Sequence, residues 1–379
     1  MHYFTFADKD TTIYEVSSSL NSGMDEILEV KKDVSETGDI VQVSRVLIKF
    51  DLSYISESIS RGLIPNPSNG HYASSSYYLN LYDAKPEALA TSQSLFAYPI
   101  SQSWSMGDGH TYDNPITTEG ASWRYRTGKI NGTLWAPQGP SASGATWFSG
   151  SELEASFSFD QDTLDVRMNV TDIVNKWISG SAYSNEGFIL KRSGSVGNFN
   201  SGSDEGSTTE LGNLSFFSSD THTKYPPTLE TVWDDSKWST GSLSPITGSD
   251  LEDMVMYMKG LRPKYKEKGK AKFRVVARGR FPAKSYSTTP SNLSVKYLPS
   301  GSSYYSIVDA ETDDLVVPYG SGSKLSCDSD GNYFNLWMNG YQPERYYKIE
   351  YRVRSGSGTV DEIDQYFDEG FTFKINKQG

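Results

Sequence analysis

Residues 45–53 read RVLIKFDLS, a short run of hydrophobic and β-branched side chains that is typical of a buried β-strand. Similar runs recur about every dozen residues through the first 233 residues. Clusters of Gly, Asn, Ser and Asp separate them, as turns require. The strands predicted in this part are 3–5, 12–16, 26–30, 45–50, 77–82, 94–100, 155–159, 187–191, 214–217 and 228–232.

A single helix interrupts these strands. Thr171 or Asp172 can begin it and Gly180 ends it. Its apolar face consists of Ile173, Val174, Trp177 and Ile178. Many strands with one helix favour a β-sandwich or jelly roll over an α/β fold. We therefore expect residues 1–233 to form a jelly-roll β-sandwich with one short helix.

A polar connector is predicted over residues 234–263. Within it, Ser249 and Glu252 have the spacing of a capping box, and Gly260 and Pro263 would end the helix that this box begins. The apolar face of the helix would be Leu251, Met254, Val255, Met258 and Leu261. We interpret this segment as a short amphipathic helix that packs between two domains.

Residues 264–379 return to strand patterns and have the size of an Ig-like sandwich. The composition agrees, because a chain that is 13% aromatic and only 36% hydrophobic, with 33 Gly, suits strands and turns better than helical bundles. The predicted fold class is all-β, with an N-terminal jelly roll, a connector helix and a C-terminal Ig-like β-sandwich. The strands predicted in this last part are 271–277, 293–298, 304–309, 314–318, 333–338, 346–352 and 370–375.

The sequence contains no recognisable catalytic motif. It lacks an HExxH helix, a GxSxG elbow, a Walker loop and a GxGxxG dinucleotide fingerprint. The single Cys327 excludes an internal disulfide and a Cys-based zinc site. The turn with Asp328 and Asp330 offers oxygens to calcium but lacks the distal Glu of a full calcium loop. We therefore expect neither enzymatic activity nor a cofactor nor a metal.

No stretch approaches the roughly 18–20 consecutive apolar residues of a transmembrane helix. The first six residues, MHYFTF, resemble the start of a strand and not a secretory signal. We therefore expect no membrane insertion, and a protein that leaves the cell within a particle released by lysis.

Charge is unevenly distributed in a chain whose net charge is −12. Residues 1–250 carry 16 basic and 31 acidic residues, whereas residues 251–379 carry 19 and 16. A basic stripe alternates along the second part, which places its members on one face of an extended strand. Such a stripe could follow the phosphate backbone of a nucleic acid. The net negative charge of the whole chain instead favours an edge strand that lysines protect, or a contact with an acidic neighbouring subunit. We therefore do not expect nucleic acid as a partner. The basic stripe consists of Lys264, Lys266, Lys268, Lys270, Lys272 and Arg274.

Aromatic residues crowd the Gly/Ser-rich stretch 101–150. Exposed aromatic rings beside polar groups can stack on pyranose rings, although the same residues serve equally as core and loop anchors. The candidate glycan platform consists of Trp104, Trp123, Tyr125 and Trp135.

Four stretches of residues 1–233 resemble the DNRLRE family of jelly-roll modules. They are RVLIKFDLS at 45–53, YLNLY at 78–82, NVTDIVNKWISG at 169–180 with NEGFILK at 185–191, and SSD at 218–220 with YPPTL at 225–229. The family occurs in bacterial surface and secreted proteins and is linked to carbohydrate binding, so the resemblance implies a jelly roll that can hold sugars. SWSM at 103–106 and GASW at 120–123 depart from the family pattern, which weakens the case for a family-type sugar site.

The remainder is similar to structural proteins of tailed phages, particularly marine T4-like ones. The similarity is carried by LPS at 298–300, YYSIVDA at 304–310, KLSCD at 324–328, YFNLWM at 333–338 and QPERYY at 342–347. It implies a place in the virion, with other virion proteins and copies of the chain as partners.

Two functional hypotheses follow. The first is a structural component of the neck, tail or baseplate of a tailed-phage virion, which docks through the basic stripe. The second is a carbohydrate-binding module that recognises host-surface glycan through the aromatic platform.

Overall fold

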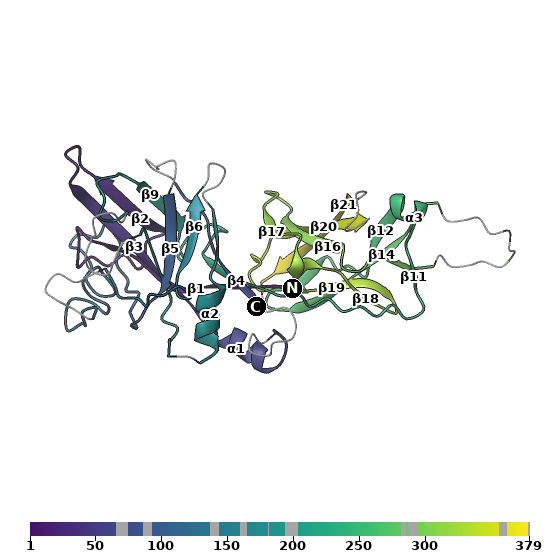
Figure 1. Ribbon diagram of the computed structural model, residues 1–379, viewed down its shortest axis with the longest axis horizontal. Helices are drawn as coiled ribbons and strands as arrows, with labels where there is room; N and C mark the ends of the chain where they lie inside the picture. The colour runs from purple at the N-terminus through teal and green to yellow at the C-terminus, as the bar shows by residue number, and fades with distance from the viewer. Residues whose placement is uncertain are drawn as a thin grey trace. The chain divides into compact units, whose positions relative to one another are not determined.

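The computed structural model describes residues 1–65, 75–85, 93–136, 144–159, 165–180, 182–193, 204–281, 286, 288, 294–355 and 362–377. Strands dominate this part of the chain, which confirms the all-β fold class (Figure 1). Contacts divide the chain into an N-terminal unit, Phe4–Thr231, and a C-terminal unit, which combines Met1–Tyr3 with Val232–Gly379. Each unit has its own sheets and its own core.

The N-terminal unit is a curled, jelly-roll-like arrangement of antiparallel strands. The strands lie in the order β6-β5-β8-β3-β1-β10-β4-β7, and β2 pairs with both β3 and β9. All ten predicted runs overlap a strand, although 3–5 and 12–16 belong to one long strand and β7 was not predicted. The bounds are β1 (His2–Tyr14), β2 (Ile27–Val34), β3 (Ile40–Phe50), β4 (Ser76–Leu81), β5 (Gln93–Pro99), β6 (Ala155–Phe159), β7 (Val166–Asn169), β8 (Phe188–Lys191), β9 (Gly212–Phe217) and β10 (Thr228–Val232).

Two α-helices lie among the described residues of this unit. The predicted one is α2 (Thr171–Ile178), and its Trp177 ring lies 4.7 Å from the ring of Phe188 on the following strand. The other, α1 (Ser53–Ser60), was not predicted. Both carboxylate oxygens of Asp51 accept hydrogen bonds from Ser53 at the start of α1, a local signal that the sequence does contain.

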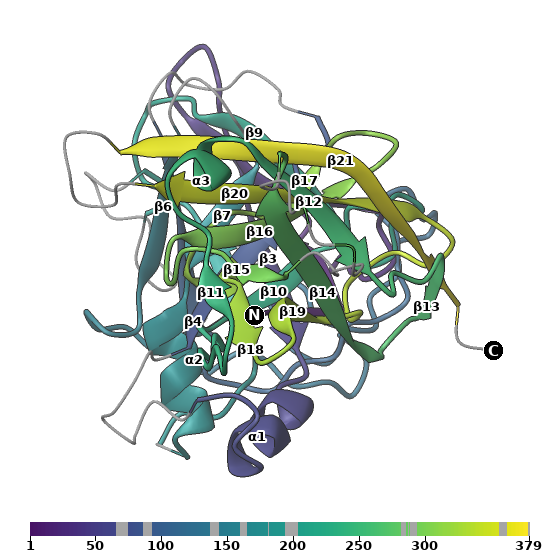
Figure 2. The same ribbon diagram turned by 90° about the vertical axis from the view of Figure 1, so that its right-hand side faces the viewer.

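The C-terminal unit is a sandwich of two sheets. One sheet has the order β11-β15-β14-β19-β18, with β12 beside β14, and the other has the order β13-β21-β20-β16-β17 (Figure 2). The bounds are β11 (Ser244–Pro245), β12 (Met254–Lys259), β13 (Lys264–Lys266), β14 (Lys270–Gly279), β15 (Lys296–Tyr297), β16 (Ser303–Asp309), β17 (Leu315–Val317), β18 (Ser326–Asp328), β19 (Gly331–Trp337), β20 (Tyr346–Ser355) and β21 (Ile363–Asn376), with a 3₁₀ turn at Ser321–Ser323.

Aromatic rings from both sheets fill the core of this sandwich. Phe334 on β19 stacks on Phe273 of β14, with ring centroids 5.1 Å apart, and on Tyr305 of β16, at 4.0 Å. Tyr351 of β20 and Phe373 of β21 are buried beside them. Large rings that interlock across two sheets hold such a sandwich by apolar burial.

The connector helix is wrong over most of its predicted length. The helix α3 covers only Ser249–Glu252, and Met254–Lys259 forms strand β12, which pairs antiparallel with β14. Met254 and Met256 are buried while Tyr257 is exposed. The apolar residues of this run fit both the helical period of about 3.6 residues and the strand period of two. The run forms a strand because it can pair with the open edge of β14.

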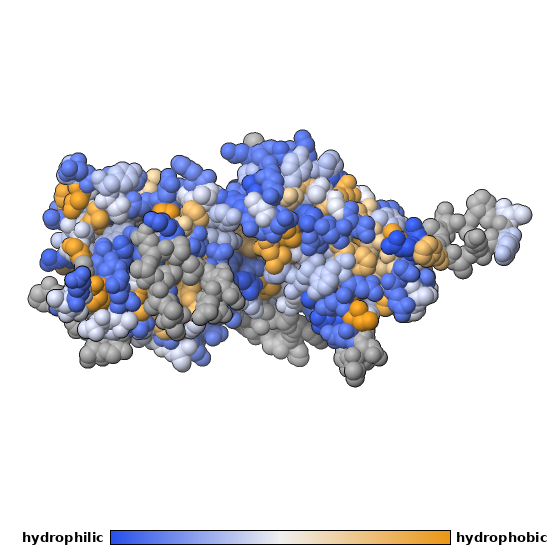
Figure 3. All heavy atoms as spheres, turned by 90° about the horizontal axis from the view of Figure 1, so that it is seen from above, coloured by the Kyte–Doolittle hydropathy of each residue, from blue (hydrophilic) through white to orange (hydrophobic). Residues whose placement is uncertain are grey.

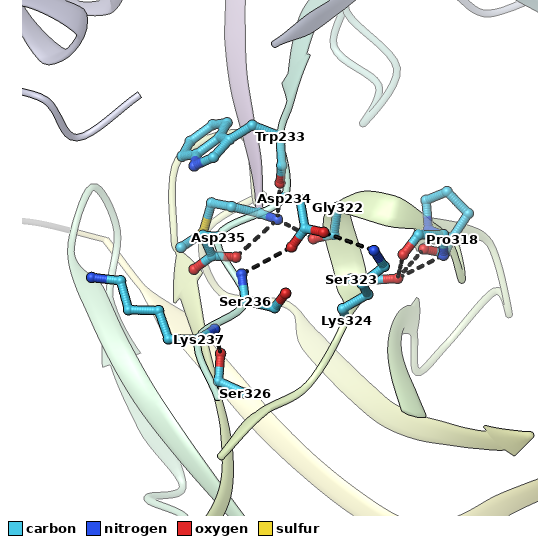
Figure 4. A network of polar contacts seen from close by, with 12 residues as sticks. Trp233, Asp234, Asp235, Ser236, Lys237, Pro318, Gly322, Ser323, Lys324 and Ser326 are labelled. Atoms are coloured by element: carbon cyan, nitrogen blue, oxygen red, sulfur yellow. Dashed lines mark hydrogen bonds and ion pairs between the residues drawn. The ribbon is translucent and has the colours of Figure 1, made fainter. Parts of the chain in front are cut away.

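The first three residues lie in the C-terminal unit, whereas the sequence interpretation placed them in the N-terminal domain. The Met1 amino group is buried, donates to the carbonyl oxygens of Trp233 and Gly322, and forms an ion pair with Asp235 at 3.2 Å (Figure 4). Burial lowers the pKa of this amino group, and the Asp235 carboxylate opposes the shift.

Hydrophobic residues are dispersed among hydrophilic ones on the face drawn in Figure 3. This distribution is ordinary for a folded surface and agrees with apolar cores that lie inside the two units.

Candidate functional site

The basic stripe does not form one strand. Lys264 and Lys266 lie on β13 at an edge of the five-stranded sheet, whereas Lys270, Lys272 and Arg274 lie on β14 of the other sheet. Lys268 lies between the two strands with a φ of 59°, a left-handed conformation that belongs to a turn. The prediction of a single extended face is therefore wrong, because the chain turns at 267–269 and changes sheets.

The basic side chains on β14, those of Lys270, Lys272 and Arg274, already have acidic or aromatic partners within the C-terminal unit. Arg274 binds Asp328 through two hydrogen bonds of 2.8 Å, and Lys272 binds the same carboxylate at 2.7 Å. The Arg274 guanidinium and the Lys272 ammonium hold the pKa of Asp328 well below its usual range. The amino groups of Lys270 and Lys272 also lie 4.9 and 3.7 Å from the ring centroids of Trp337 and Tyr333.

These ion pairs involve the same two carboxylates, Asp328 and Asp330, that the sequence offered as calcium ligands. Both carboxylate oxygens of Asp328 already accept hydrogen bonds from cations, and Arg274 also lies 3.4 Å from Asp330. Within the described ranges, no group of three or more His, Cys, Asp or Glu side chains could hold a metal ion.

The predicted glycan platform is wrong for its three tryptophans. Trp104, Trp123 and Trp135 are buried, and they belong to one hydrophobic core of the N-terminal unit. The indole N–H groups of Trp104 and Trp135 donate to the carbonyl oxygens of Glu186 and Ser122, at 2.9 Å each. Tyr125 is half-buried in a turn, with its backbone bridged to Leu134. The three tryptophan rings are core anchors and offer no open face to a sugar.

Cations cover the faces of two of these indoles. The Arg45 guanidinium lies 4.8 Å from the Trp123 ring centroid, and the Lys9 ammonium lies 4.2 Å from that of Trp104. A cation over an indole face takes the place that a pyranose would need.

The C-terminal unit carries a partly exposed aromatic surface that the sequence interpretation missed. Tyr304 on β16 pairs in register with Arg352 on β20, which pairs with Tyr366 on β21. The Arg352 guanidinium lies 4.6 Å from the ring centroid of Tyr304 and 5.2 Å from that of Tyr319. Tyr319 and Tyr366 meet edge to face at 5.9 Å, and Tyr366 is 64% exposed. We call these four residues the tyrosine–arginine patch.

Ion pairs flank the tyrosine–arginine patch on the same side of β20. Arg354 binds Asp364 through hydrogen bonds of 2.7 and 2.9 Å. Lys348 lies 2.9 Å from Glu350 and 3.0 Å from Asp368, and these acids raise the pKa of the Lys348 ammonium. The alternation of β20 could have shown that Lys348, Arg352 and Arg354 share a face. Their cross-strand neighbours depend on the register of three strands.

No protein-family model, curated protein or solved structure gives a significant match to this chain. None of the helices in the described residues has the length and hydrophobicity that a membrane span needs. The two resemblances stated from the sequence therefore stay predictions.

Proposed function

We propose that this chain is a structural component of a tailed-phage virion, in the neck, tail or baseplate, and that it works by protein–protein assembly. The sequence resemblance of residues 298–347 to phage structural proteins supports the location. The tyrosine–arginine patch supports the mode of action and is the observation on which the proposal rests.

The tyrosine–arginine patch has the make-up of an interface centre. Tyr and Arg are the residue types that contribute most to binding when they lie at the centre of a contact, surrounded by a polar rim. Here Arg352 is already held between Tyr304 and Tyr319, so docking would cost little further side-chain entropy. The Arg354–Asp364 and Lys348–Asp368 pairs supply the polar rim.

Quantitative mass spectrometry of purified virions from the source organism tests the proposal directly. We expect a fixed copy number per particle in a multiple of three, six or twelve, since closed assemblies are symmetric. Absence from the particles, together with soluble protein in the lysate, would overturn the assembly function.

Removing the centre of the patch should prevent docking. We expect Arg352→Ala with Tyr366→Ala to lower incorporation into particles by about 30-fold or more when the variant chain is supplied during infection, because the loss of even one hot-spot residue costs about 2 kcal/mol or more. Tyr257→Ala, at a tyrosine that is 42% exposed on β12, is the matched control. Equal incorporation of the double variant and the control, with both folded by circular dichroism, would contradict the docking role.

The lysines of the basic stripe that precede β14, Lys264, Lys266 and Lys268, are expected to contribute to docking through their charge. Lys266→Glu with Lys268→Glu should lower incorporation, and the loss should shrink as salt is added during assembly, because exposed charges act over a Debye length of about 8–10 Å. Lys129→Glu with Lys237→Glu makes the same change in net charge at exposed positions elsewhere. A similar loss for both pairs would show a general charge effect and would remove the stripe from the docking surface.

Carbohydrate binding by the N-terminal unit is the second proposal. The resemblance of residues 1–233 to jelly-roll modules supports it, whereas the buried tryptophans do not.

A further inference from the structure

The five-stranded sheet of the C-terminal unit has a long open edge along β21. On one side, β21 pairs with β20 through residues 363–374. On the other side, β13 pairs only with residues 374–376 (Figure 2). Among the described residues, no strand pairs with 363–373 on that side, and we call this stretch the open edge of β21. By contrast, the edge strands β17 and β18 have only three residues each, which is how folded sheets usually limit an exposed edge.

Backbone groups on the open edge of β21 face outward. The backbone N–H of Arg354 donates to the carbonyl oxygen of Ser302 at 2.8 Å, so the peptide groups of Arg354 face the β16 side of β20. Its opposite residue Asp364 is therefore in a non-hydrogen-bonded pair, and the N–H and C=O of Asp364 face away from β20. Tyr366, opposite Arg352, has the same orientation because it lies two residues further along. The edge thus presents the alternating donors and acceptors that an added strand uses.

Apolar side chains on both faces of β21 lack cover. Tyr366 lies on the face of the tyrosine–arginine patch and is 64% exposed. On the opposite face, Ile363 is 59% exposed and Phe367 is half-buried, although Tyr351, the neighbour of Phe367 on β20, is buried. Charges alone are enough to protect an edge strand, so these exposed aromatic and aliphatic side chains point to a partner that covers them.

Carboxylates outnumber cations along the open edge. The Arg354 guanidinium is shared by Asp364, at 2.7 Å, and Glu362, at 2.9 Å. The Lys348 ammonium is likewise shared by Asp368, at 3.0 Å, and by a second carboxylate on its own strand. Each cation therefore meets two carboxylates, and the edge keeps a negative charge that a cationic partner would complement.

A second copy of the chain fits this edge poorly. Antiparallel pairing of two β21 edges about Tyr366 would place Asp364 of each copy opposite Asp368 of the other. Like charges directly opposite one another destabilise a sheet, whereas opposite charges stabilise it. The two aspartates therefore oppose self-pairing and favour a strand that carries cations.

We infer that the open edge of β21 binds an extended segment of a partner protein, which adds a strand beside residues 363–369 and carries cationic side chains four residues apart. These cations lie opposite Asp364 and Asp368, and the residue midway between them lies against Tyr366. Main-chain hydrogen bonds supply the affinity and the charge pairs supply the selectivity. This inference rests on the proposed assembly function and names the kind of partner that docks at the tyrosine–arginine patch.

A synthetic peptide tests this recognition on the full chain. The probe is acetyl-Thr-Lys-Val-Tyr-Val-Lys-Thr-amide, whose sequence is the same in both directions, so its lysines meet the two aspartates in either orientation. Fluorescence polarisation of the labelled peptide measures its affinity. We expect saturable binding, and about tenfold or weaker binding when Glu replaces both lysines of the peptide. N-methylation of the peptide's tyrosine should weaken binding about fivefold or more, because it removes a main-chain donor to the edge.

Hydrogen–deuterium exchange locates the bound peptide. The amides of residues 363–369 should exchange more slowly when the peptide is present. The strand β12 is the internal control, because it also lies at the edge of a sheet but contains no acidic residue within Met254–Lys259. Its exchange should not change.

A charge-neutral variant tests the role of the two aspartates. Asp364→Asn with Asp368→Asn keeps side-chain acceptors, including the one that the Gly370 backbone N–H uses, and removes both charges. We expect it to bind the lysine peptide about threefold or more weakly and to lose the preference over the Glu peptide. Glu36→Gln with Asp108→Asn makes the same change in net charge at exposed positions and should bind as the unaltered chain does.

Four results would overturn the inference. They are no binding of the lysine peptide, equal binding of the Glu peptide, equal binding of the N-methylated peptide, and dimers of the chain in analytical ultracentrifugation that the peptide dissociates. The last result would make a second copy the occupant of the edge. Failure of the assembly function is a separate result, because absence of the chain from virions leaves peptide binding by the purified chain unchanged.

Discussion

Replacing Glu205 by Gln is expected to lower the free energy of unfolding of the N-terminal unit by about 3–5 kcal/mol, because the change leaves buried cations without their counter-charge. Glu205 is fully buried and binds Arg45 through two hydrogen bonds of 3.0 and 2.7 Å. The Lys191 ammonium, which is also buried, lies 3.2 Å from the same carboxylate. One carboxylate therefore serves two buried cations.

The two cations respond differently when Glu205 is lost. Burial lowers the pKa of Lys191 to about 8, and Glu205 is the main group that opposes this shift, so Lys191 can shed its proton in the variant. Arg45 has no such way to relieve the loss of its partner. Its guanidinium would be left with the Gly144 carbonyl oxygen at 2.6 Å and the rings of Trp123 and Trp147. Arg45 therefore carries most of the expected cost.

Chemical denaturation followed by tryptophan fluorescence measures this loss, and hydrogen exchange of β3 and β8 assigns it to the N-terminal unit. Lys191→Met is the matched control, because it leaves the Arg45–Glu205 pair intact and replaces a buried charge by an apolar chain. We expect that variant to lie within about 1 kcal/mol of the unaltered protein or above it. An unchanged stability for Glu205→Gln would show that solvent reaches Arg45.

Replacing Asp10 by Asn is expected to stabilise the protein at pH 8. Asp10 is 1% exposed on β1, its Oδ2 accepts from the Ser219 backbone N–H at 2.8 Å, and its Oδ1 has no hydrogen-bond partner among the described residues. Burial raises its pKa from 3.8 to about 7, and the nearby charge of Asp220 adds to the shift. The folded state therefore prefers the protonated carboxyl group.

The pH window follows from this shift. Between about pH 4 and pH 7 the folded state binds a proton that the unfolded state has lost, so stability falls as pH rises. The full contribution is present below pH 3.8 and is lost above about pH 7, and it amounts to roughly 4 kcal/mol. Asn keeps the acceptor for Ser219 and never ionises, so the variant avoids this loss.

Thermal unfolding of both proteins at pH values from 4 to 8 checks the prediction. The stability difference should be small at pH 4, should grow as the pH rises from 4 to 7 and should level off at higher pH. Asp108→Asn removes one acid at an exposed position and should leave the pH profile nearly unchanged. A difference that does not vary with pH would mean that Asp10 is ionised in the folded protein.

Local patterns predicted most strands, because burial on one face of a strand imposes a period of two that depends on neighbouring residues alone. Residues 346–352 show this alternation of buried side chains, whereas residues 45–50 form an almost continuous buried run, and both lie within strands of the structure. Met254–Lys259 shows the limit of this reasoning. Its apolar residues fit both periods, and only the unpaired edge of β14 selected the strand.

The candidate sites depended on contacts between distant residues. Sequence spacing predicted alternating cations but could not show that the chain turns at Lys268 or that Asp328 neutralises Arg274. The aromatic composition of 101–150 did not reveal which rings are buried, since the burial of Trp104, Trp123 and Trp135 depends on distant residues that pack around them.

By itself, the sequence determined the all-β class, most strand positions and the helix around Trp177, because these follow from side-chain periodicity and turn residues over short distances. The tertiary structure alone decided that Met1–Tyr3 belong to the C-terminal unit, that Arg45 and Glu205 meet across 160 residues, and which strands lie side by side. The physical reason is that sheet order and burial are fixed by the pairing of distant strands, which no local pattern encodes.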